Sequence, residues 1–415
     1  MRAKPLVAIV CGLMNPIPPV KAGGPQLVIW NTCKHLSDEE FDWKVLSLWD
    51  EAVDAFDFDR DRFLQLRVGN REAKISQLAQ KLPYRLVKSW FGVVRPDHLA
   101  LNLAMVRELK RMKPDVVIVH ESYSLCFMVA RALPKAKVVF YHHICRMHLD
   151  LKQKQLERLL KSARNGIIAI NSTASPLAIE KFGSSPKNEW VIINGVDDKL
   201  IHSSVEEFEP AQKDSNAFTF INVGRITPIK GLDILIEAME TVARFSSQKA
   251  RLIIVGSAAV DEGGDLAFEA QLKERAGKIG NDIVQFAGFV PNDLLVKYYR
   301  QADCGVLPTR LMEGNSLFLM ECLAMGVPVI ATKIGGVPDV VRDGLDGILI
   351  KERVNAEELA EVMLGMISEK ELWGSRKTKI LNHAREVFDY RRVASQIEGV
   401  VEELLISKTR TGVDS

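Results

Sequence analysis

Two glutamates, Glu313 and Glu321, are separated by seven residues that span the predicted start of a helix. Ser316 suits the N-cap position, and the apolar residues 317–324 continue the helix until Gly326 ends it. Glu313 is therefore expected at the helix N-terminus, and Glu321 about one and a half turns inside the helix. The free N–H groups of a helix N-terminus suit a phosphate, and ionised carboxylates accept hydrogen bonds from hydroxyls. Together these groups indicate a sugar nucleotide; the alternative is an ordinary strand–loop–helix unit with two solvated glutamates.

Two cations, Arg225 and Lys230, follow another apolar run at residues 218–223. Gly224 permits a sharp turn after this run, and an apolar-periodic helix is predicted at residues 232–242. Open α/β sheets bind ligands at the carboxyl ends of their strands, so both cations are placed to clamp a diphosphate. The planar guanidinium can bind two phosphate oxygens at once. A lone Arg/Lys pair is more often surface charge, but in combination with the two glutamates we interpret it as a diphosphate clamp.

The sequence around these residues resembles the retaining glycosyltransferases of family 4. The resemblance rests on the spacing G-R-x-x-x-x-K-G from Gly224 to Gly231, and on E-x7-E followed by A-M-G-V-P-V-I-A-T. It covers essentially the whole C-terminal half, with further matching segments at 194–197, 286–290, 334–341 and 344–347. In the N-terminal half it is looser and rests on the segments 23–24, 119–121 and 141–143. The family has the GT-B architecture, so the resemblance implies an α/β fold with two doubly wound Rossmann-like domains facing across a cleft.

The resemblance also implies an activity, the transfer of a hexosyl unit from a nucleoside diphosphate sugar to an acceptor hydroxyl with retained anomeric configuration. In this reaction Arg225 and Lys230 would stabilise the departing diphosphate. Glu313 would hold hydroxyls of the donor sugar, and Glu321 those of the ribose. His120 lies where the family places a histidine against the transferred sugar. The expected catalytic residues are His120, Arg225, Lys230 and Glu313. The expected donor-binding residues are Gly23, Gly24, Arg225, Lys230, Gly288, Val290, Glu313, Gly314, Asn315, Ser316, Leu317 and Glu321.

No metal and no cofactor besides the donor substrate is expected. The site has no D-x-D-like metal motif, and by resemblance the departing phosphate helps to take the acceptor proton. Four histidines, His120, His142, His143 and His148, cluster in the sequence. However, the last two are five residues apart, a spacing that does not place two ligands on one helix face. By resemblance, His142 and His143 match a position near the acceptor cleft.

The resemblance favours a saccharide or a lipid-linked molecule as the acceptor, in bacterial cell-surface polysaccharide or glycolipid synthesis. It does not assign the donor sugar, because Asn315 and Ser316 stand where the family often has an aromatic residue and a glycine. Two alternatives remain open. One is a sugar-nucleotide epimerase of GT-B shape, which would need acid/base carboxylates that cannot be placed here. The other is a non-catalytic homologue that binds a sugar nucleotide.

Length and composition agree with an ordinary globular protein of two domains. The chain has 415 residues, more than one hydrophobic core usually serves, with 47% hydrophobic and 26% charged residues. The net charge of +2 indicates no particular partner, and no nucleic-acid ligand is expected. Six cysteines without C-x-x-C spacing favour free thiols in a reducing compartment. We find no signal-peptide pattern and no apolar stretch of membrane-spanning length, so a cytoplasmic location is expected.

Strand and helix patterns alternate through the chain twice. The expected domains are an acceptor-side domain at 1–200, a nucleotide-sugar-binding domain at 201–390, and a C-terminal helix within 391–415 that crosses back to the first domain. Strands are predicted at 6–13, 44–48, 116–120, 137–142, 166–170, 189–193, 218–223, 251–255, 283–289, 304–307, 327–331 and 347–350. Helices are predicted at 24–36, 99–112, 124–133, 151–163, 174–182, 232–242, 317–324, 356–368, 371–387 and 391–405.

The segment 60–113 is strongly basic. It contains thirteen Lys and Arg against four Asp and Glu, a net charge of +9 in a chain whose total is +2. Trp90 and Phe91 lie within it beside leucines at helical spacing. A solvated charged face with a few core residues is one interpretation. The other is a basic-aromatic patch that binds anionic lipid at the inner membrane face and presents the first domain to a lipid-linked acceptor.

Overall fold

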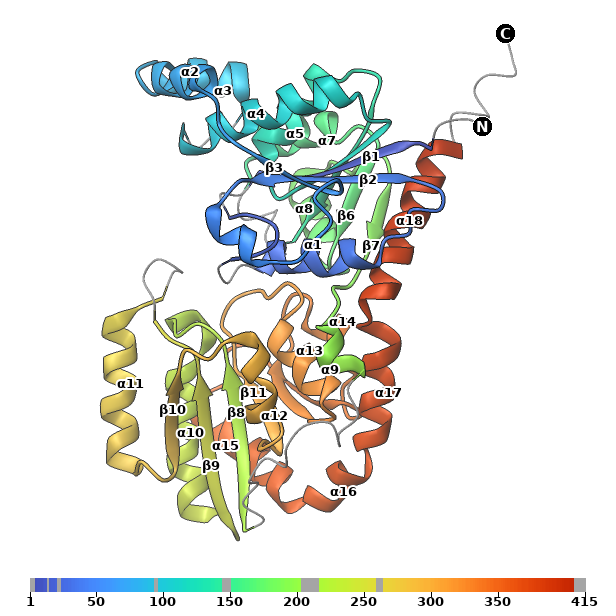
Figure 1. Cartoon of the computed structure of the whole chain (residues 1–415). Coiled ribbons are helices and arrows are strands. Elements are labelled where there is room, and N and C mark those ends of the chain that lie inside the picture. Colours follow the sequence, from blue (N-terminus) through green and yellow to red (C-terminus); the bar gives the residue numbers. More distant parts are fainter. Residues whose placement is uncertain are drawn as a thin grey trace. The chain divides into compact units, whose positions relative to one another are not determined.

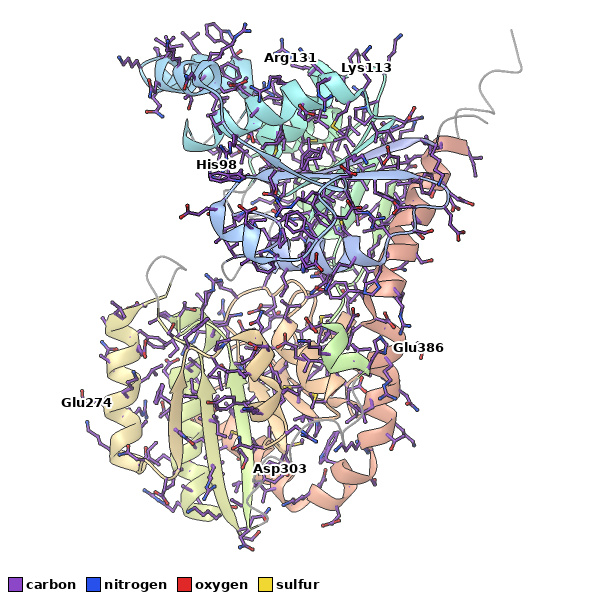
Figure 2. The ribbon with its side chains drawn as sticks, in the orientation of Figure 1. His98, Lys113, Arg131, Glu274, Asp303 and Glu386 are labelled. Carbon is purple, nitrogen blue, oxygen red and sulfur yellow. The ribbon has the colours of Figure 1, made fainter. Side chains whose placement is uncertain are left out.

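The computed structural model describes residues 4–12, 15–20, 24–92, 96–143, 151–202, 216–258 and 264–406. It divides into two compact units (Figure 1). Unit 1 comprises Met1–Gly195 together with Tyr390–Ser415, and unit 2 comprises Val196–Asp389. In each unit, side chains fill the space between a sheet and its helices (Figure 2). Gly23 and His148 lie outside the described residues.

Unit 1 is built on a parallel sheet of seven strands in the order β3-β2-β1-β4-β5-β6-β7. The strand order reverses between β1 and β4, so the chain leaves these two neighbours toward opposite halves of the sheet. The central strands are continuous apolar runs because both faces of the sheet are covered. The strands are β1 Leu6–Cys11, β2 Asp42–Leu48, β3 Phe63–Leu66, β4 Val116–His120, β5 Lys137–His142, β6 Gly166–Ala169 and β7 Glu189–Val191.

The helices of unit 1 form two large cores with the sheet, and a smaller cluster lies among α2, α3, α4 and α5. The first contains Val28 of α1 and Tyr390, Ile397 and Val401 of α18, and the second contains apolar residues of α4, α5 and α7. The C-terminal helix α18 therefore belongs to the core of unit 1. The helices are α1 Gly24–His35, η1 Glu51–Ala55, α2 Asn70–Gln80, α3 Tyr84–Phe91, α4 Pro96–Met112, α5 Tyr123–Ala132, α7 Gln153–Ser162, α8 Ala174–Phe182 and α18 Tyr390–Ile406.

Unit 2 repeats the same plan with a parallel sheet of six strands in the order β10-β9-β8-β11-β12-β13. Here the strand order reverses between β8 and β11. The strands are β8 Ala217–Val223, β9 Lys249–Val255, β10 Val284–Gly288, β11 Cys304–Leu307, β12 Val329–Thr332 and β13 Gly347–Ile350.

Helices α10 and α15 cover one face of this sheet and pack against each other. Asn355 caps α15, because its side chain accepts the Glu358 N–H at 2.8 Å while the Glu358 carboxylate accepts the Asn355 N–H at 3.3 Å. The helices are α9 Asp198–His202, η2 Pro228–Lys230, α10 Leu232–Phe245, α11 Leu266–Ile279, η4 Asn292–Leu294, α12 Val296–Tyr299, α13 Leu317–Ala324, α14 Val337–Val340, α15 Ala356–Ser368, α16 Lys370–Ser375 and α17 Lys377–Val387.

The predicted α/β fold class is confirmed, and two details differ from the sequence prediction. Strand β3 and helix α2 were not predicted; β3 is a four-residue edge strand, and its run F-L-Q-L is too short to stand out. The helical spacing around Trp90 and Phe91 falls on α3. The predicted helix 371–387 is two helices that meet at Arg376. Its guanidinium donates to the Gly344 carbonyl at 2.6 Å and lies 4.5 Å from the Trp373 ring centre. These tertiary contacts are invisible in the periodicity of the helix.

No helix in the described part of the chain combines the length and apolar character that crossing a bilayer requires.

Candidate active site

The candidate site of unit 2 lies at the carboxyl ends of β8 and β11. These strands are neighbours at the point where the strand order reverses, which is where open α/β sheets bind ligands. The loop at 224–231 follows β8 and carries both predicted cations, while the loop at 308–316 follows β11 and carries Glu313. The topology therefore brings together two motifs that are about eighty residues apart in the sequence.

Lys230 and Glu313 form an ion pair between these loops. The Lys230 ammonium donates to Glu313 Oε1 at 2.6 Å, and the two side chains are 20% and 16% exposed. The same oxygen accepts the Thr309 hydroxyl at 3.2 Å. The Glu313 backbone carbonyl accepts the Gly336 N–H at 2.9 Å. The predicted clamp and the predicted sugar-binding carboxylate thus contact each other directly, and each neutralises the charge of the other.

Further hydrogen bonds join the two loops around this pair. The Arg310 N–H donates to the Ile229 carbonyl at 2.8 Å, and its guanidinium donates to the Pro228 carbonyl at 2.7 Å. The other end of the guanidinium pairs with Asp233 at 2.6 Å, in the first turn of α10. Arg310 was not predicted, because two of its partners lie on the other loop and the third in α10, and no sequence spacing links them to Arg310.

Gly231 fits where a side chain has no room. Its φ is +71°, and a Cβ atom there would lie 2.1 Å from the Pro308 carbonyl oxygen. Only glycine satisfies both conditions. The close approach of Gly231 to the end of β11 fixes Lys230, its neighbour in the chain, beside the second loop.

Helix α13 begins as predicted at Leu317 with Ser316 at the N-cap. The Ser316 backbone is extended, but its hydroxyl makes no capping hydrogen bond with the described residues. The N–H groups of the first helical turn have no intrahelical acceptors and are therefore available to an anion. Gly314 is partly buried, and Asn315 and Ser316 are buried, so the predicted phosphate-binding backbone is fixed within the unit.

Glu321 lies inside α13 and accepts a hydrogen bond from the Tyr299 hydroxyl. Burial raises the pKa of Glu321 to about 7; the Tyr299 hydrogen bond acts in the opposite direction, and Asp197 raises the pKa further. Tyr299 is fully buried at the end of α12 and was not predicted. Because one carboxylate oxygen of Glu321 is occupied by Tyr299, the tyrosine fixes the orientation of the carboxylate.

The remaining predicted residues of unit 2 also lie at the carboxyl ends of strands. Arg225 is exposed directly after β8, where Gly224 has φ +153°. Gly288 ends the edge strand β10, and its carbonyl accepts the Gly256 N–H at 2.8 Å. A register shift between Phe286 and Gly288 interrupts the regular ladder just before Gly288 pairs with Val255, and the partly buried Val290 follows the end of the strand. The ends of β8, β9 and β10 thus form one continuous edge of backbone.

In unit 1, His120 ends β4 beside the reversal of strand order. Its Nδ1 lies 2.7 Å from Nε2 of His143, and both rings are buried. Burial lowers the pKa of each ring to about 3, so both imidazoles are neutral. Glu121 supports the pair: its carboxylate accepts the His143 backbone N–H and lies 3.2 Å from His142 Nδ1.

The pairing of the two rings has a chemical consequence. One nitrogen of the 2.7 Å contact must carry the proton, so of the two outer nitrogens one is a donor and the other an acceptor. Neither His120 Nε2 nor His143 Nδ1 has a hydrogen-bond partner among the described residues. The pair therefore keeps one buried donor and one buried acceptor whose hydrogen-bonding capacity is unused among these residues. Gly24 begins α1 in the same unit.

One group of ligand-type side chains among the described residues has a spacing that a metal ion could use. Asp198 and His202 of α9 and Asp389 have ligand atoms within 4.8 Å of one another. His202 Nε2 and Asp389 Oδ2 are 3.2 Å apart, so an ion pair accounts for their approach. None of the three belongs to the predicted site.

Comparison with known proteins agrees with this geometry. The sequence profile of Glycosyltransferase Family 4 matches residues 22–200, and that of Glycosyl transferases group 1 matches residues 204–385. The chain belongs to the glycosyltransferases that combine these two domains. Its predicted membership is thereby confirmed, and the two profiles meet near the boundary between the two units.

Individual relatives are distant. The glycosyltransferase is 28% identical to the D-inositol 3-phosphate glycosyltransferase of Geodermatophilus obscurus over 206 residues, 47% of this chain and 44% of the relative. It thus spans about half the length of that relative. It is 22% identical to the lipopolysaccharide 1,2-N-acetylglucosaminetransferase of Salmonella typhimurium, over 70% of this chain and 74% of the relative. Its fold matches Anabaena Alr3699/HepE, solved in complex with UDP, with a TM-score of 0.71, 18% identity and coverage of 96% and 99%.

Replacing Gly231 by alanine should destabilise unit 2. The added methyl group meets the Pro308 carbonyl and the left-handed backbone is strained, so we expect a loss of about 1–3 kcal/mol in the free energy of unfolding. Urea unfolding followed by circular dichroism measures this loss. The matched control is Gly365→Ala inside α15, where a Cβ meets nothing within 4 Å. This variant should be neutral or more stable by up to about 1 kcal/mol. Equal effects of the two substitutions would contradict the close fit.

Replacing Glu321 by glutamine should change how stability depends on pH. The native carboxyl has a pKa of about 7 against an ordinary value of 4.5, so the native state holds an extra proton between these values. Ionisation then costs stability as the pH rises through this window. We expect the variant to gain about 1–3 kcal/mol relative to the wild type from about pH 5 to about pH 8. Thermal melting at both pH values tests this.

The control for this experiment is Glu361→Gln, on the exposed side of α15. Its melting temperature relative to the wild type should be the same at both pH values. A difference between Glu321→Gln and the wild type that does not change with pH would contradict the raised pKa of Glu321.

Proposed function

We propose that this glycosyltransferase moves a hexosyl unit from a nucleoside diphosphate sugar to an acceptor hydroxyl and retains the anomeric configuration. The observation that carries the proposal is the 2.6 Å pair between Lys230 and Glu313, at the point where the strand order of unit 2 reverses. A cation for the leaving diphosphate and a carboxylate for sugar hydroxyls are here in direct contact. The complex of HepE with UDP supports a uridine nucleotide, and the lipopolysaccharide transferase supports a saccharide acceptor.

Donor binding exchanges the partners of this pair. The diphosphate takes the place of Glu313 at the Lys230 ammonium, and the released carboxylate accepts hydroxyls of the donor sugar. Arg225 and the N–H groups at the start of α13 bind the remaining phosphate oxygens. As the bond to the sugar breaks, charge grows on the diphosphate, and these fixed donors stabilise it.

Glu321 holds the ribose hydroxyls in this proposal. Tyr299 already donates to Oε2, which leaves Oε1 as the acceptor for the ribose. The ionised form accepts both hydroxyls best, so the nucleotide favours deprotonation of a group whose pKa is about 7 in the empty site. Nucleotide binding and ionisation of Glu321 are therefore linked.

The acceptor proton passes to the departing phosphate, in the front-face route that the family resemblance implies. This route needs no protein nucleophile. In unit 1, the outer nitrogens of His120 and His143 bind a saccharide hydroxyl, because they are neutral and have no partner among the described residues. The acceptor is a saccharide or lipid-linked molecule of cell-surface polysaccharide or glycolipid synthesis.

Incubation with labelled uridine diphosphate hexoses and candidate saccharide acceptors tests the function. We expect a glycosylated product whose anomeric configuration, read by proton NMR, equals that of the donor. An epimerised donor, or binding without turnover, would contradict the proposal and favour the epimerase or the non-catalytic reading. Lys230→Ala should lower kcat/KM about 30- to 1000-fold, which corresponds to about 2–4 kcal/mol for a lost charged donor.

The ion pair supplies an internal control for this variant. Without Lys230, the Glu313 carboxylate is left unpaired and repels the diphosphate. The double variant Lys230→Ala/Glu313→Gln should therefore bind UDP more tightly than Lys230→Ala alone. Lys379→Ala, an exposed lysine on α17, should match the wild type. If the double variant binds UDP no better than Lys230→Ala, the two side chains do not share the diphosphate site.

We propose in addition that helices α2 and α3 contact an anionic membrane surface. Leu78 of α2 and Trp90 of α3 are 62% and 53% exposed, while Val87 of α3 is buried in a core. Part of the basic charge is neutralised: four arginines of this segment pair with acids. The basic residues that remain exposed beside the apolar face are Arg71, Lys74, Lys81 and Arg85.

The protein should then sediment with phosphatidylglycerol vesicles at low salt and stay in the supernatant with phosphatidylcholine vesicles. Binding should decline as the salt approaches about 0.15 M, because the Debye length shrinks to about 8 Å. Replacing Leu86 and Trp90 together by serine should abolish it, since both are exposed on α3. Phe245→Ser, which removes an aromatic side chain that is 67% exposed at the end of α10, is the control. Sedimentation unaffected by the α3 substitutions would exclude this surface.

A further inference from the structure

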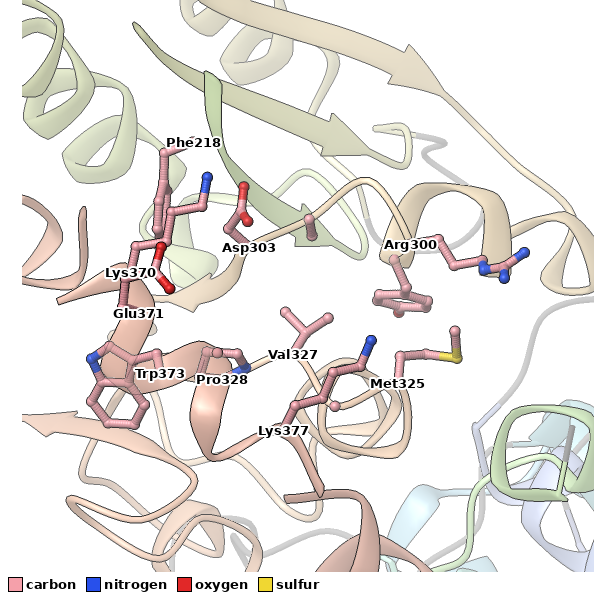
Figure 3. A pocket seen from close by; sticks show the side chains of 14 residues that line it. Phe218, Arg300, Asp303, Met325, Val327, Pro328, Lys370, Glu371, Trp373 and Lys377 are labelled. Atoms are coloured by element: carbon pink, nitrogen blue, oxygen red, sulfur yellow. The ribbon is translucent and has the colours of Figure 1, made fainter. Parts of the chain in front are cut away.

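Unit 2 has a pocket of about 500 Å³ at the end of its sheet opposite the candidate active site (Figure 3). Phe218 lies at the start of β8, Asp303 directly precedes β11, and Pro328 directly precedes β12. These are the amino-terminal ends of the strands, whereas Lys230 and Glu313 follow the carboxyl ends. The pocket is therefore separate from the candidate active site.

The wall of the pocket combines an apolar floor with cationic side chains. Val327 and Pro328 contribute apolar surface between the strands, and Trp373 of α16 forms a buried part of the wall. Lys370 holds its ammonium 6.0 Å from the centre of the Phe218 ring. Two carboxylates, Asp303 and Glu371, also line the pocket; Figure 3 shows them on the same side as Lys370, whereas Lys377 extends from another side.

Lys377 is the cation that the pocket presents most openly. Its Cγ and Cε atoms lie against Gly326, where a Cβ would be 2.7 Å and 3.2 Å from them. The stem is thus held across the end of α13, and the side chain lies between Val327 and Met325 (Figure 3). Among the described residues Lys377 has no ion pair. Asp303, the acid nearest the strand ends, already accepts the Thr219 N–H at 2.8 Å.

We propose that this pocket binds a small organic anion with an apolar body, such as an aromatic carboxylate or sulfonate. The apolar floor accommodates the body, and the Lys370 and Lys377 ammonium groups pair with the charge. A neutral molecule of the same shape would gain no attraction to Lys377, which has no ion pair among the described residues, so the charge decides the selectivity.

Residues that line the pocket also contact residues of the candidate active site. Tyr299 lines the pocket and donates its hydroxyl hydrogen bond to Glu321. Met325 and Gly326 line it at the C-terminal end of α13, the helix whose first turn lies at the donor site. An anion that shifts Tyr299 changes the orientation of Glu321, and so the affinity for the nucleotide. This second step, unlike the binding itself, rests on the proposed function.

The test uses two probes with the same kind of aromatic body. The anionic probe is 1-anilinonaphthalene-8-sulfonate, and the neutral one is N-phenyl-1-naphthylamine. Their fluorescence is titrated with the full-length protein, with and without saturating UDP, so that binding at the nucleotide site is recognised. We expect the sulfonate to bind in the presence of UDP at least about fivefold more tightly than the neutral probe.

Two variants assign the binding to this pocket. Lys377→Met keeps the stem across Gly326 but removes the charge, and should weaken sulfonate binding about three- to tenfold without affecting the neutral probe. Gly374→Leu fills the rim of the pocket, where a Cβ meets nothing within 4 Å, and should weaken both probes. Lys379→Met on the same helix as Lys377 is the matched control and should bind like the wild type. Unchanged sulfonate binding in Lys377→Met and Gly374→Leu would overturn the proposal.

The connection to the active site is read from the same titrations. If the sites are coupled, the sulfonate changes the UDP affinity and UDP changes the sulfonate affinity by the same factor. Tyr299→Phe removes the hydrogen bond to Glu321. In this variant the sulfonate should still bind, but it should no longer change the UDP affinity. Independent binding in the wild type would overturn the coupling. If UDP does not bind at all, the proposed function fails, whereas the Lys377 and Gly374 variants still decide whether the pocket binds the anion.

Discussion

The close contact between Gly231 and the Pro308 carbonyl fixes the arrangement of unit 2 on which its candidate site depends. Two parallel strands, β8 and β11, are neighbours although the chain leaves them toward opposite halves of the sheet. Their following loops must therefore pass each other at one point, and there is no room for a side chain there. This contact sets Lys230 beside Glu313, and the loop that carries Glu313 sets the first turn of α13. The position of Glu321 follows from that of the helix.

The candidate site balances its charges internally. Lys230 and Glu313 neutralise each other, and Glu321, with a pKa of about 7, is partly protonated near neutral pH. In unit 1, His120 and His143 are neutral and hydrogen-bonded to each other. Buried ionisable groups with shifted pKa values are typical of functional sites, and they are held there at a cost in stability. A ligand with phosphates and hydroxyls replaces internal partners by its own groups, so it gains affinity without creating unpaired charge.

The sequence predicts a helix or strand well where the residues that define its bounds lie within or next to that element. The bounds of α13 follow from Ser316, the apolar run and Gly326, and the buried strands follow from short continuous apolar runs rich in β-branched residues. It does not reveal partners that meet only in the fold. Tyr299 and Glu321 lie on different helices, and Arg310 binds a loop about eighty residues away. The pairing of His120 with His143 likewise depends on β4 and β5 being adjacent, which periodicity does not specify.

The central claim is that the nucleotide diphosphate binds where the Lys230–Glu313 pair bridges the loops after β8 and β11. A crystal structure of the protein with UDP tests this most directly. We expect phosphate oxygens within about 3 Å of Lys230 Nζ and of N–H groups at the start of α13, and ribose hydroxyls hydrogen-bonded to the Glu321 carboxylate. We also expect that Glu313 no longer contacts Lys230. A nucleotide bound elsewhere on unit 2, with the 2.6 Å pair intact, would contradict the account.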